Sequence, residues 1–194
     1  MKALGILGSG RGTNCRAILE KIRAGRLSAE VRIIVSDVLD APILDIAREF
    51  SIPNVYLPPG PFRTRLEPAV ENELVKMLQD AGVELVVLAG YMRVLKMPML
   101  AAFPHRIVNI HPSLLPKFPG LEAWTQALAA GETVTWCTVH YVDAKIDHGD
   151  IIVQREVPIL PNDTPETLHA RIQNAEHELY PAAIAQLCNN EQRN

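Results

Sequence analysis

The chain has 194 residues, of which 48% are hydrophobic and 21% charged, a composition typical of a globular protein. A formal net charge of −3 argues against a broad basic surface that binds nucleic acid. The sequence has no apolar run of about 18 residues, so it predicts no membrane-spanning helix. Three cysteines, Cys15, Cys137 and Cys188, lie far apart without a C-x-x-C spacing, which favours a reducing cytoplasm over a zinc site or a disulfide framework. The length fits one domain, which we expect to occupy residues 1–194.

Short apolar runs alternate with helical patterns over the first two thirds of the chain. Continuous apolar runs bounded by glycine or polar residues predict buried strands, and apolar residues three or four positions apart predict helices. In chain order we expect a strand at residues 3–7, a helix at 14–24, a strand at 31–35, a helix at 41–50, a strand at 54–57, a helix at about 63–81, and strands at 84–91 and 106–110. Such alternation is typical of a parallel sheet with helices on both faces.

The last third of the chain has a different pattern. A helix expected at residues 120–130 is followed by two β-rich runs, at 133–142 and 151–159, which are joined by a short loop. Two strands so close together predict an antiparallel or mixed edge of the sheet. The two-residue period of a strand places His140 on the same side as Trp136, so we expect this histidine to pack or to support a neighbour rather than to catalyse.

The C-terminal part is expected to be a long helix. Asp163 or Thr164 is suited to cap it, Pro165 suits its first turn, and it should run to about residue 187 before a polar tail at about 188–194. Together the elements predict a three-layer α/β fold with a mostly parallel, Rossmann-like sheet. Helices should cover both faces, and an antiparallel or mixed edge should lie near the C-terminus.

The loop GSGRGTN, at residues 8–14, joins the first strand to the first helix. In open parallel sheets, ligands bind beyond the carboxyl ends of the strands, and a helix N-terminus there offers N–H groups to a phosphate. Glycines also let the backbone approach such a ligand closely. We therefore expect Gly12, Thr13 and Asn14 to hold a small phosphomonoester. The alternative is a tight turn that needs glycine for its geometry only.

Two other nucleotide-binding motifs fit this loop less well. The dinucleotide fingerprint G-x-G-x-x-G requires glycine where Thr13 or Cys15 stands, and the G-K-[ST] of a P-loop is missing. Asp37, just past the second strand, can imitate the acid that binds a ribose in dehydrogenases. A dehydrogenase therefore stays open as a minor alternative.

The apolar run RIVNIH ends in polar side chains. Asn109 and His111 are two residues apart, so they point to the same side of the chain, and Pro112 should end the strand. An acid from the loop IDHGD, Asp147 or Asp150, would favour the protonated form of His111. A cationic histidine beside an amide suits an oxyanion, or a leaving nitrogen that needs a proton. A turn at Asn109 and a buried core histidine are the structural alternative.

Five motifs in this sequence resemble those of one enzyme family. They are GSGRGTN, LAGYMRVL, NIHPSLLPKFPG, TVHYVDAKIDHGDII and NAEHELYP, at residues 8–14, 88–95, 109–120, 138–152 and 174–181. In this order they are similar to the phosphoribosylglycinamide formyltransferases of purine synthesis, within the 10-formyltetrahydrofolate transferase superfamily. NIHPSLLP followed by D-x-G-x-I is typical of the superfamily, and the glycine loop and EHELYP narrow the resemblance to this member. The resemblance extends from residue 3 to about residue 187.

The resemblance implies direct transfer of a formyl group from 10-formyltetrahydrofolate to the amine of glycinamide ribonucleotide, without a metal. It implies that Asn109, His111 and Asp147 are catalytic, and that Asp147 keeps the histidine protonated. The implied ribonucleotide contacts are Gly12, Thr13, Asn14 and Glu176, and the implied folate contacts are Arg65, Met92, Arg93, Val94, Leu95 and Asn109. The implied partners are these two small molecules, with no nucleic acid and no membrane, and the protein is expected to be a cytoplasmic monomer or homodimer.

The chain departs from the family pattern near the expected rim of the site. After PKFPG, where the family commonly has a histidine-containing stretch, this chain has LEAWTQ. The departures are Glu122, Trp124, Trp136, His148 and Asp150. We expect them to affect the acceptor more than the formyl donor. They leave open formyl transfer to a different amine, such as an amino-sugar nucleotide or methionyl-tRNA, and a catalytically inactive homologue that binds folate or nucleotide.

Overall fold

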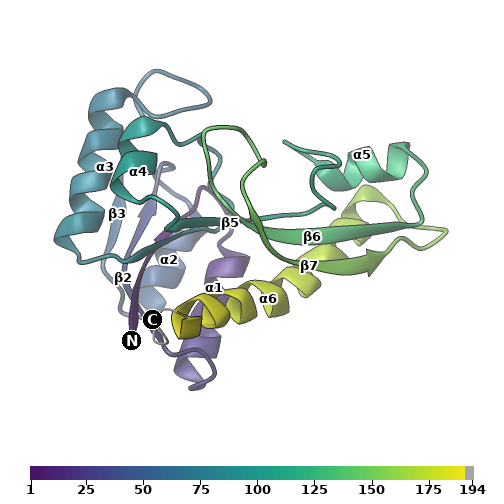
Figure 1. Cartoon of the computed structure of the whole chain (residues 1–194), viewed down its shortest axis with the longest axis horizontal. Coiled ribbons are helices and arrows are strands. Elements are labelled where there is room, and N and C mark those ends of the chain that lie inside the picture. Colours follow the sequence, from purple (N-terminus) through teal and green to yellow (C-terminus); the bar gives the residue numbers. More distant parts are fainter. Residues whose placement is uncertain (191–194) are drawn as a thin grey trace.

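A seven-stranded sheet forms the centre of the chain, and the computed structural model describes residues 1–190 (Figure 1). The strands are β1 (Lys2–Leu7), β2 (Ala29–Ser36), β3 (Asn54–Tyr56), β4 (Leu85–Leu88), β5 (Ile107–His111), β6 (Val134–Tyr141) and β7 (Ile151–Pro158). Across the sheet they lie in the order β3-β2-β1-β4-β5-β6-β7. Strands β1 to β5 run parallel, whereas β6 and β7 are antiparallel to their neighbours. This topology confirms the predicted mostly parallel sheet with an antiparallel edge.

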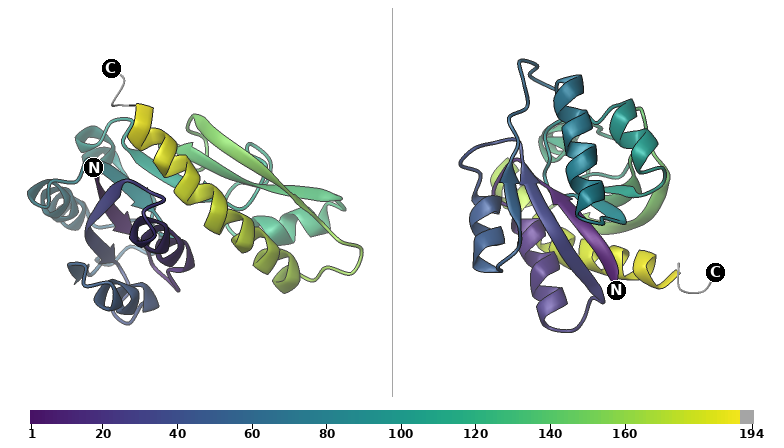
Figure 2. Two further views of the ribbon diagram at one scale, coloured as in Figure 1. Left: turned by 90° about the horizontal axis from the view of Figure 1, so that it is seen from below. Right: turned by 90° about the vertical axis from the view of Figure 1, so that its left-hand side faces the viewer.

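Helices cover both faces of the sheet. They are α1 (Thr13–Arg23), α2 (Pro42–Glu49), α3 (Pro68–Asp80), α4 (Met97–Ala102), α5 (Ala123–Ala129) and α6 (Pro165–Asn190). Buried side chains of α1, α2 and α6 pack in one hydrophobic cluster, and those of α3 and α4 pack in a second cluster on the opposite face. Figure 2 shows α6 as one long helix that runs beside β6 and β7. No helix within residues 1–190 combines the length and the apolar character that a membrane crossing requires.

Neighbouring residues of the central strands contribute to the two clusters in turn. On β1, Ile6 packs in the cluster of α1 and α6, whereas Leu7 packs in the cluster of α3. On β4, Val87 packs in the cluster of α1 and α6, and Val86 packs in the cluster of α3. Because these strands are buried on both faces, their sequences are continuous apolar runs rather than alternating ones.

The strand order reverses between β1 and β4, near the middle of the sheet. From β1 the chain moves outward to β2 and β3, and it then returns to β4 and continues to β5 on the other side. Loops that leave the carboxyl edge at such a point diverge and open a crevice, which is where ligands bind in this class of fold. Below it, the hydroxyl of the fully buried Tyr180 lies 3.0 Å from the carbonyl oxygens of both Leu88 and Val108. This side chain of α6 therefore ties together the ends of β4 and β5.

The structure corrects two predicted elements and contains one helix that was not predicted. The helix α3 begins at Pro68 rather than near residue 63, because Arg65 pairs with Val94 in an isolated parallel bridge instead. The sequence pattern does not predict α4, since a helix of six residues carries little periodicity. Strand β4 ends at Leu88 because Gly90, with a positive φ of 72°, turns the chain.

The C-terminal helix is longer than predicted. The sequence pattern predicts an end near residue 187, whereas α6 continues to Asn190. Part of the predicted polar tail is therefore helical. The rest of it, residues 191–194, lies outside the described part of the chain.

Candidate active site

A cavity of about 860 Å³ opens at the carboxyl edge of the sheet, where the strand order reverses. Its lining combines the glycine loop, the loop after β4, the end of β5, the loops after β5 and β6, and one side of α6. The predicted site residues found in this lining are Gly12, Thr13, Asn14, Arg65, Met92, Val94, Asn109, His111, Asp147 and Glu176. A single cavity of this size, with polar groups from remote parts of the chain, is typical of a small-molecule site.

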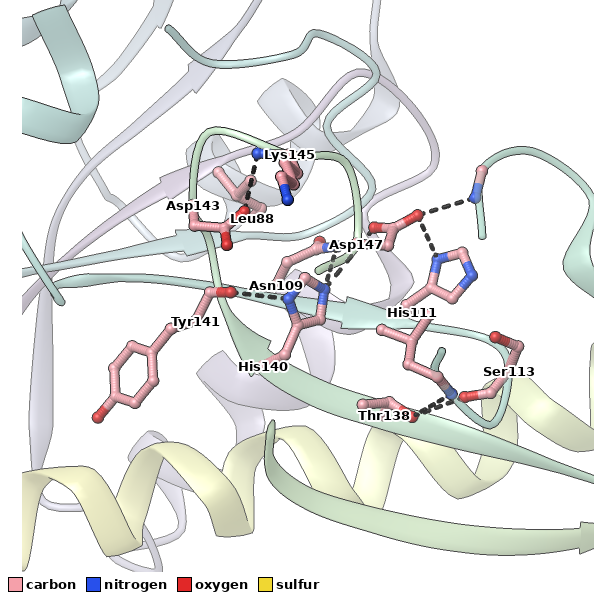
Figure 3. A network of polar contacts seen from close by, with 12 residues as sticks. Leu88, Asn109, His111, Ser113, Thr138, His140, Tyr141, Asp143, Lys145 and Asp147 are labelled. Carbon is pink, nitrogen blue, oxygen red and sulfur yellow. Dashed lines mark hydrogen bonds and ion pairs between the residues drawn. The ribbon is translucent and has the colours of Figure 1, made fainter. Parts of the chain in front are cut away.

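His111 and Asp147 face one another at the end of β5 (Figure 3). Nδ1 of His111 lies 3.4 Å from Oδ2 of Asp147, and both side chains are largely buried. The other ring nitrogen, Nε2, lies 2.9 Å from the carbonyl oxygen of Phe118, which can only accept a hydrogen bond. Both nitrogens thus face acceptors, an arrangement that suits the protonated imidazolium. The N–H of Gly120 donates to Oδ2 of Asp147 over 2.8 Å and helps to hold this carboxylate.

His140 orients the side chain of Asn109. Nδ1 of His140 lies 2.8 Å from the carbonyl oxygen of Tyr141, so this nitrogen carries the hydrogen and Nε2 is the acceptor. Nδ2 of Asn109 lies 3.3 Å from that Nε2 and donates to it. Burial lowers the pKa of His140, which favours this neutral form. The second N–H of the Asn109 amide remains available to a ligand, and the geometry agrees with a supporting role for His140.

The glycine loop leads into α1, and the N-terminus of this helix lies at the cavity without a side-chain cap. Gly12 is the N-cap of α1, with φ of 70°, and a Cβ there would lie 2.9 Å from side-chain atoms of Ile43 and Ile46. Glycine is therefore required at this position. No side chain caps α1, and its first turn holds no acidic residue. The N–H groups of this turn, including those of Thr13 and Asn14, are available to an anion.

Glu176 connects α6 to the glycine loop. Nδ2 of Asn14 donates to Oε2 of Glu176 over 2.9 Å. Glu176 is 6% exposed, and burial of its carboxyl group raises the pKa of Glu176 to about 7. Glu176 therefore holds a proton more readily than an exposed glutamate, and it can offer a bound ligand either a donor or an acceptor.

Asp37 and Arg93 form a buried connection between three loops. The Asp37 carboxylate accepts hydrogen bonds from the hydroxyl of Ser9 (2.5 Å) and from Nε of Arg93 (2.6 Å). The Ser9 oxygen accepts from the N–H of Met92 (2.9 Å), and the Arg93 guanidinium donates to the carbonyl oxygen of Phe62 (2.8 Å). Both oxygens of Asp37 are thus occupied, which counts against a ribose-binding acid of the dehydrogenase kind. The Arg93 side chain, a predicted folate contact, does not line the cavity.

The other predicted folate residues are divided between the cavity and the core. Met92 is 58% exposed, and Val94 lies beside it in the cavity wall. The Arg65 guanidinium stacks over the ring of Phe62, 4.1 Å from its centroid. Leu95, by contrast, is 3% exposed and packs in the cluster of α3. Its side chain anchors the loop and does not line the cavity.

The LEAWTQ segment forms part of the cavity wall. Glu122 and Trp124 both line the cavity, and the Trp124 ring stacks on His169 of α6, with centroids 3.8 Å apart and planes 5° from parallel. The departures from the family pattern that do not line the cavity are Trp136, His148 and Asp150. Of the unusual residues, those that contact the cavity are therefore confined to the segment before and within α5.

The sequence prediction missed Arg11, His169 and Gln173, which also line the cavity. Arg11 lies inside the glycine loop, and the other two lie on α6. With Glu176 they follow the i, i+4, i+7 spacing of one helix face. This spacing is visible in the sequence, but it identifies site residues only once α6 is known to pass beside the cavity.

Comparison with known sequences assigns the family. A sequence model of the formyl transferase family matches residues 2–184. The chain belongs to the formyl transferase family. A phosphoribosylglycinamide formyltransferase of Bacillus subtilis (strain 168) is 40% identical over 187 residues, which cover 96% of this chain and 95% of that protein. The trifunctional purine biosynthetic protein adenosine-3 of Drosophila pseudoobscura pseudoobscura is 45% identical over 188 residues, which cover 96% of this chain but only 14% of that longer protein.

Solved structures in this formyl transferase family share the fold. Glycinamide ribonucleotide transformylase 1 from Symbiobacterium toebii is 49% identical, with a TM-score of 0.91 over 95% of this chain and 86% of that one. Phosphoribosylglycinamide formyltransferase from Bacillus halodurans is 44% identical, with a TM-score of 0.92 over 97% of this chain and 96% of that one. These likenesses confirm the predicted Rossmann-like fold.

In this formyl transferase cavity, groups that can donate a proton lie beside groups that can bind an anion. The Asn109 amide and the His111 ring supply donors on one side, and the start of α1 supplies N–H groups on the other. Cysteine nucleophiles are disfavoured, since burial raises the pKa of Cys15 and of Cys137 to about 12. The site therefore suits attack by a nucleophile that belongs to a substrate.

Proposed function

We propose that this chain is a phosphoribosylglycinamide formyltransferase of purine biosynthesis. In this proposal it transfers the formyl group of 10-formyltetrahydrofolate to the amine of glycinamide ribonucleotide. The supporting observation is that Asn109, His111 and Asp147 meet in the same cavity as the uncapped start of α1. A formyl carbonyl needs the donors of the first group, and a phosphorylated amine needs the N–H groups of the second.

The proposed reaction is a direct displacement. The acceptor amine attacks the formyl carbon, a new C–N bond forms, and the carbonyl electrons move to the oxygen. The Asn109 amide and the His111 imidazolium donate to this oxyanion. The bond from the carbon to the folate nitrogen then breaks, as His111 gives that nitrogen a proton and the attacking amine releases one to water. Donation from Nε2 of His111 would replace its bond to the Phe118 carbonyl, while Asp147 keeps the ring in position.

The donor is proposed to lie against the loop after β4. Main-chain groups there can bind the edges of a flat heterocycle, and Met92 and Val94 offer apolar surface. Arg65, in the same lining, suits the carboxylates of a folate tail. The proposal includes no metal and no macromolecular substrate. A cytoplasmic location, and a monomer or homodimer, remain predictions from the sequence.

One observation favours a different acceptor as the second candidate. Glu122 and Trp124 line the cavity in the segment where the resemblance leads us to expect a histidine-containing stretch, so the wall beside the acceptor has a different chemistry. An amino-sugar nucleotide or methionyl-tRNA is then the alternative amine. A binding protein without catalysis is disfavoured, because Asn109, His111 and Asp147 keep a geometry suited to proton donation.

An acceptor screen tests the proposal. The purified chain, given 10-formyltetrahydrofolate and glycinamide ribonucleotide, should release tetrahydrofolate, followed by absorbance, and should form the formylated ribonucleotide, followed by mass spectrometry. Parallel reactions contain an amino-sugar nucleotide or methionyl-tRNA. Release with one of these and not with glycinamide ribonucleotide would establish the second candidate. No release with any acceptor would indicate a binding protein.

A histidine substitution tests the chemistry. His111→Ala should lower kcat by about a hundredfold or more, because the proton donor is lost. Binding of the ribonucleotide, measured by isothermal titration calorimetry, should change little. His148→Ala is the matched control, since this histidine is exposed and does not line the cavity. Unchanged turnover in the His111 variant would remove that residue from its proposed role.

A further inference from the structure

Arg11 is the one charged residue of the glycine loop. It stands between Gly10 and Gly12, its side chain is exposed, and it lines the 860 Å³ cavity. A Cβ built on Gly10 would meet no heavy atom within 4 Å, so there is open space beside the loop at this point. A ligand can therefore approach the backbone of the loop and the Arg11 guanidinium together.

The Arg11 guanidinium is not neutralised by the protein. Its Nη2 donates to the neutral amide oxygen Oε1 of Gln173 over 3.2 Å, and no carboxylate within residues 1–190 forms an ion pair with it. The next cation along the chain differs, because Nη2 of Arg16 lies 2.6 Å from Oε2 of Glu49. A guanidinium with a planar set of donors and no carboxylate is suited to an anion with several oxygens, such as a phosphate.

The surroundings of Arg11 favour negative charge. The first turn of α1, which begins one residue after Gly12, has neither a side-chain cap nor an acidic residue. Its N–H groups and the helix dipole therefore act in the same direction as the guanidinium charge. The positive charge of Arg11 also lowers the pKa of His169, after the larger effect of burial, so its field reaches the wall formed by α6.

We propose that Arg11 binds the phosphate of the acceptor substrate and makes the enzyme select phosphorylated amines over their dephosphorylated forms. Gln173 holds the guanidinium beside the start of α1 until the phosphate arrives. This inference rests on the proposed function for the identity of the acceptor. It adds a specificity-determining side chain to a loop whose other contacts are backbone N–H groups.

The test compares two acceptors on two variants. With glycinamide ribonucleotide, Arg11→Gln should raise KM by about tenfold or more while kcat changes little, since a charge-assisted hydrogen bond to a dianion is lost. With the dephosphorylated ribonucleoside, the same variant should have the kcat/KM of the unsubstituted chain. Arg16→Gln is the matched control: it removes the same charge from the same helix start, but its guanidinium is bound by Glu49.

Two kinetic results would overturn the inference. One is an equal loss of kcat/KM for both acceptors in Arg11→Gln, and the other is an equal effect of Arg11→Gln and Arg16→Gln. Titration of inorganic phosphate into each protein separates this inference from the proposed function. Weaker phosphate binding in Arg11→Gln alone supports Arg11 even where the acceptor is a different phosphorylated amine, and unchanged binding refutes it.

Discussion

Glu176 is a carboxylic acid enclosed between α1 and α6, where it accepts a hydrogen bond from Asn14 and still lines the cavity. Burial raises its pKa from the ordinary value of 4.5 to about 7. Between these two pH values the unfolded chain loses the proton while the folded chain keeps it. The contribution of this group to stability is therefore fully present at low pH and is lost as the pH rises through about 7.

Glu176→Gln should remove this pH dependence. Relative to the unsubstituted chain, the variant should gain unfolding free energy between about pH 5 and about pH 8, by about 3 kcal/mol at most, because glutamine cannot ionise. Urea unfolding at the two pH values measures the difference. Glu178→Gln is the control, since Glu178 is an exposed residue whose pKa is lowered by Lys21, and its ionisation does not change over that pH range. Parallel curves for the Glu176 variant and the unsubstituted chain would contradict the assignment.

At the scale of elements, α6 shows how local chemistry decides where a helix begins. The sequence pattern allows Asp163 or Thr164 as the cap. In the structure the N–H of Thr167 donates to Oγ1 of Thr164 over 3.3 Å, and the N–H of Thr164 donates to Oγ1 of Thr167 over 2.9 Å. Asp163 is instead bound by Arg171, whose guanidinium holds the pKa of that carboxyl group well below its usual range. Thr164 is therefore the cap, in a reciprocal pair that resembles a capping box.

Thr164→Ala should lower the free energy of unfolding by about 1 kcal/mol, because one N–H at the start of α6 loses its partner. The loss is measured by urea unfolding at a pH near neutrality. Thr164→Ser keeps the hydroxyl and should retain most of the stability. Equal losses in the two variants would show that the methyl group, not the cap, stabilises this end of the helix.

At the scale of the whole molecule, Asp37 connects loops that follow three different strands. It lies just past β2, Ser9 follows β1, and Arg93 follows β4. Arg93 in turn reaches the carbonyl oxygen of Phe62 in the loop after β3. Asp37 is 5% exposed, so its hydrogen bonds are well shielded from water. This network holds the glycine loop and the loop after β4 in fixed relation on either side of the cavity.

Asp37→Ala should lower the free energy of unfolding by about 3 kcal/mol, because the partly buried Arg93 is left without its partner. The double variant Asp37→Ala with Arg93→Met should recover part of this loss. Thermal and urea unfolding of the single and double variants provide the measurement. Asp40→Ala, at an exposed position on the same turn, is the control. Additive losses in the double variant would mean that the two side chains are not coupled.

Much of the fold follows from local rules in the sequence. The buried strands β1, β2 and β4 can be recognised in the sequence as apolar runs. The loop after β1 can be recognised by its glycines, and Gly12 adopts the positive φ that favours this residue. The relation of Asn109 to His111 is also local, since the two-residue period of a strand puts both on one side. The family resemblance then implied the role of Asp147, a residue that no local rule connects to β5.

The contacts between distant residues depend on the strand order and are decided only by the tertiary structure. His111 meets Phe118 because the loop after β5 folds back on the end of that strand. It meets Asp147 because β6 lies beside β5 and the loop after β6 runs back toward the end of β5. The Arg93 side chain does not line the cavity, because β1 and β4 are neighbours and Arg93 binds Asp37 beside Ser9 instead. Chain periodicity records which side a residue faces but not which residues lie opposite, so it could not predict Phe118 as a partner of His111, or Asp37 as a partner of Arg93.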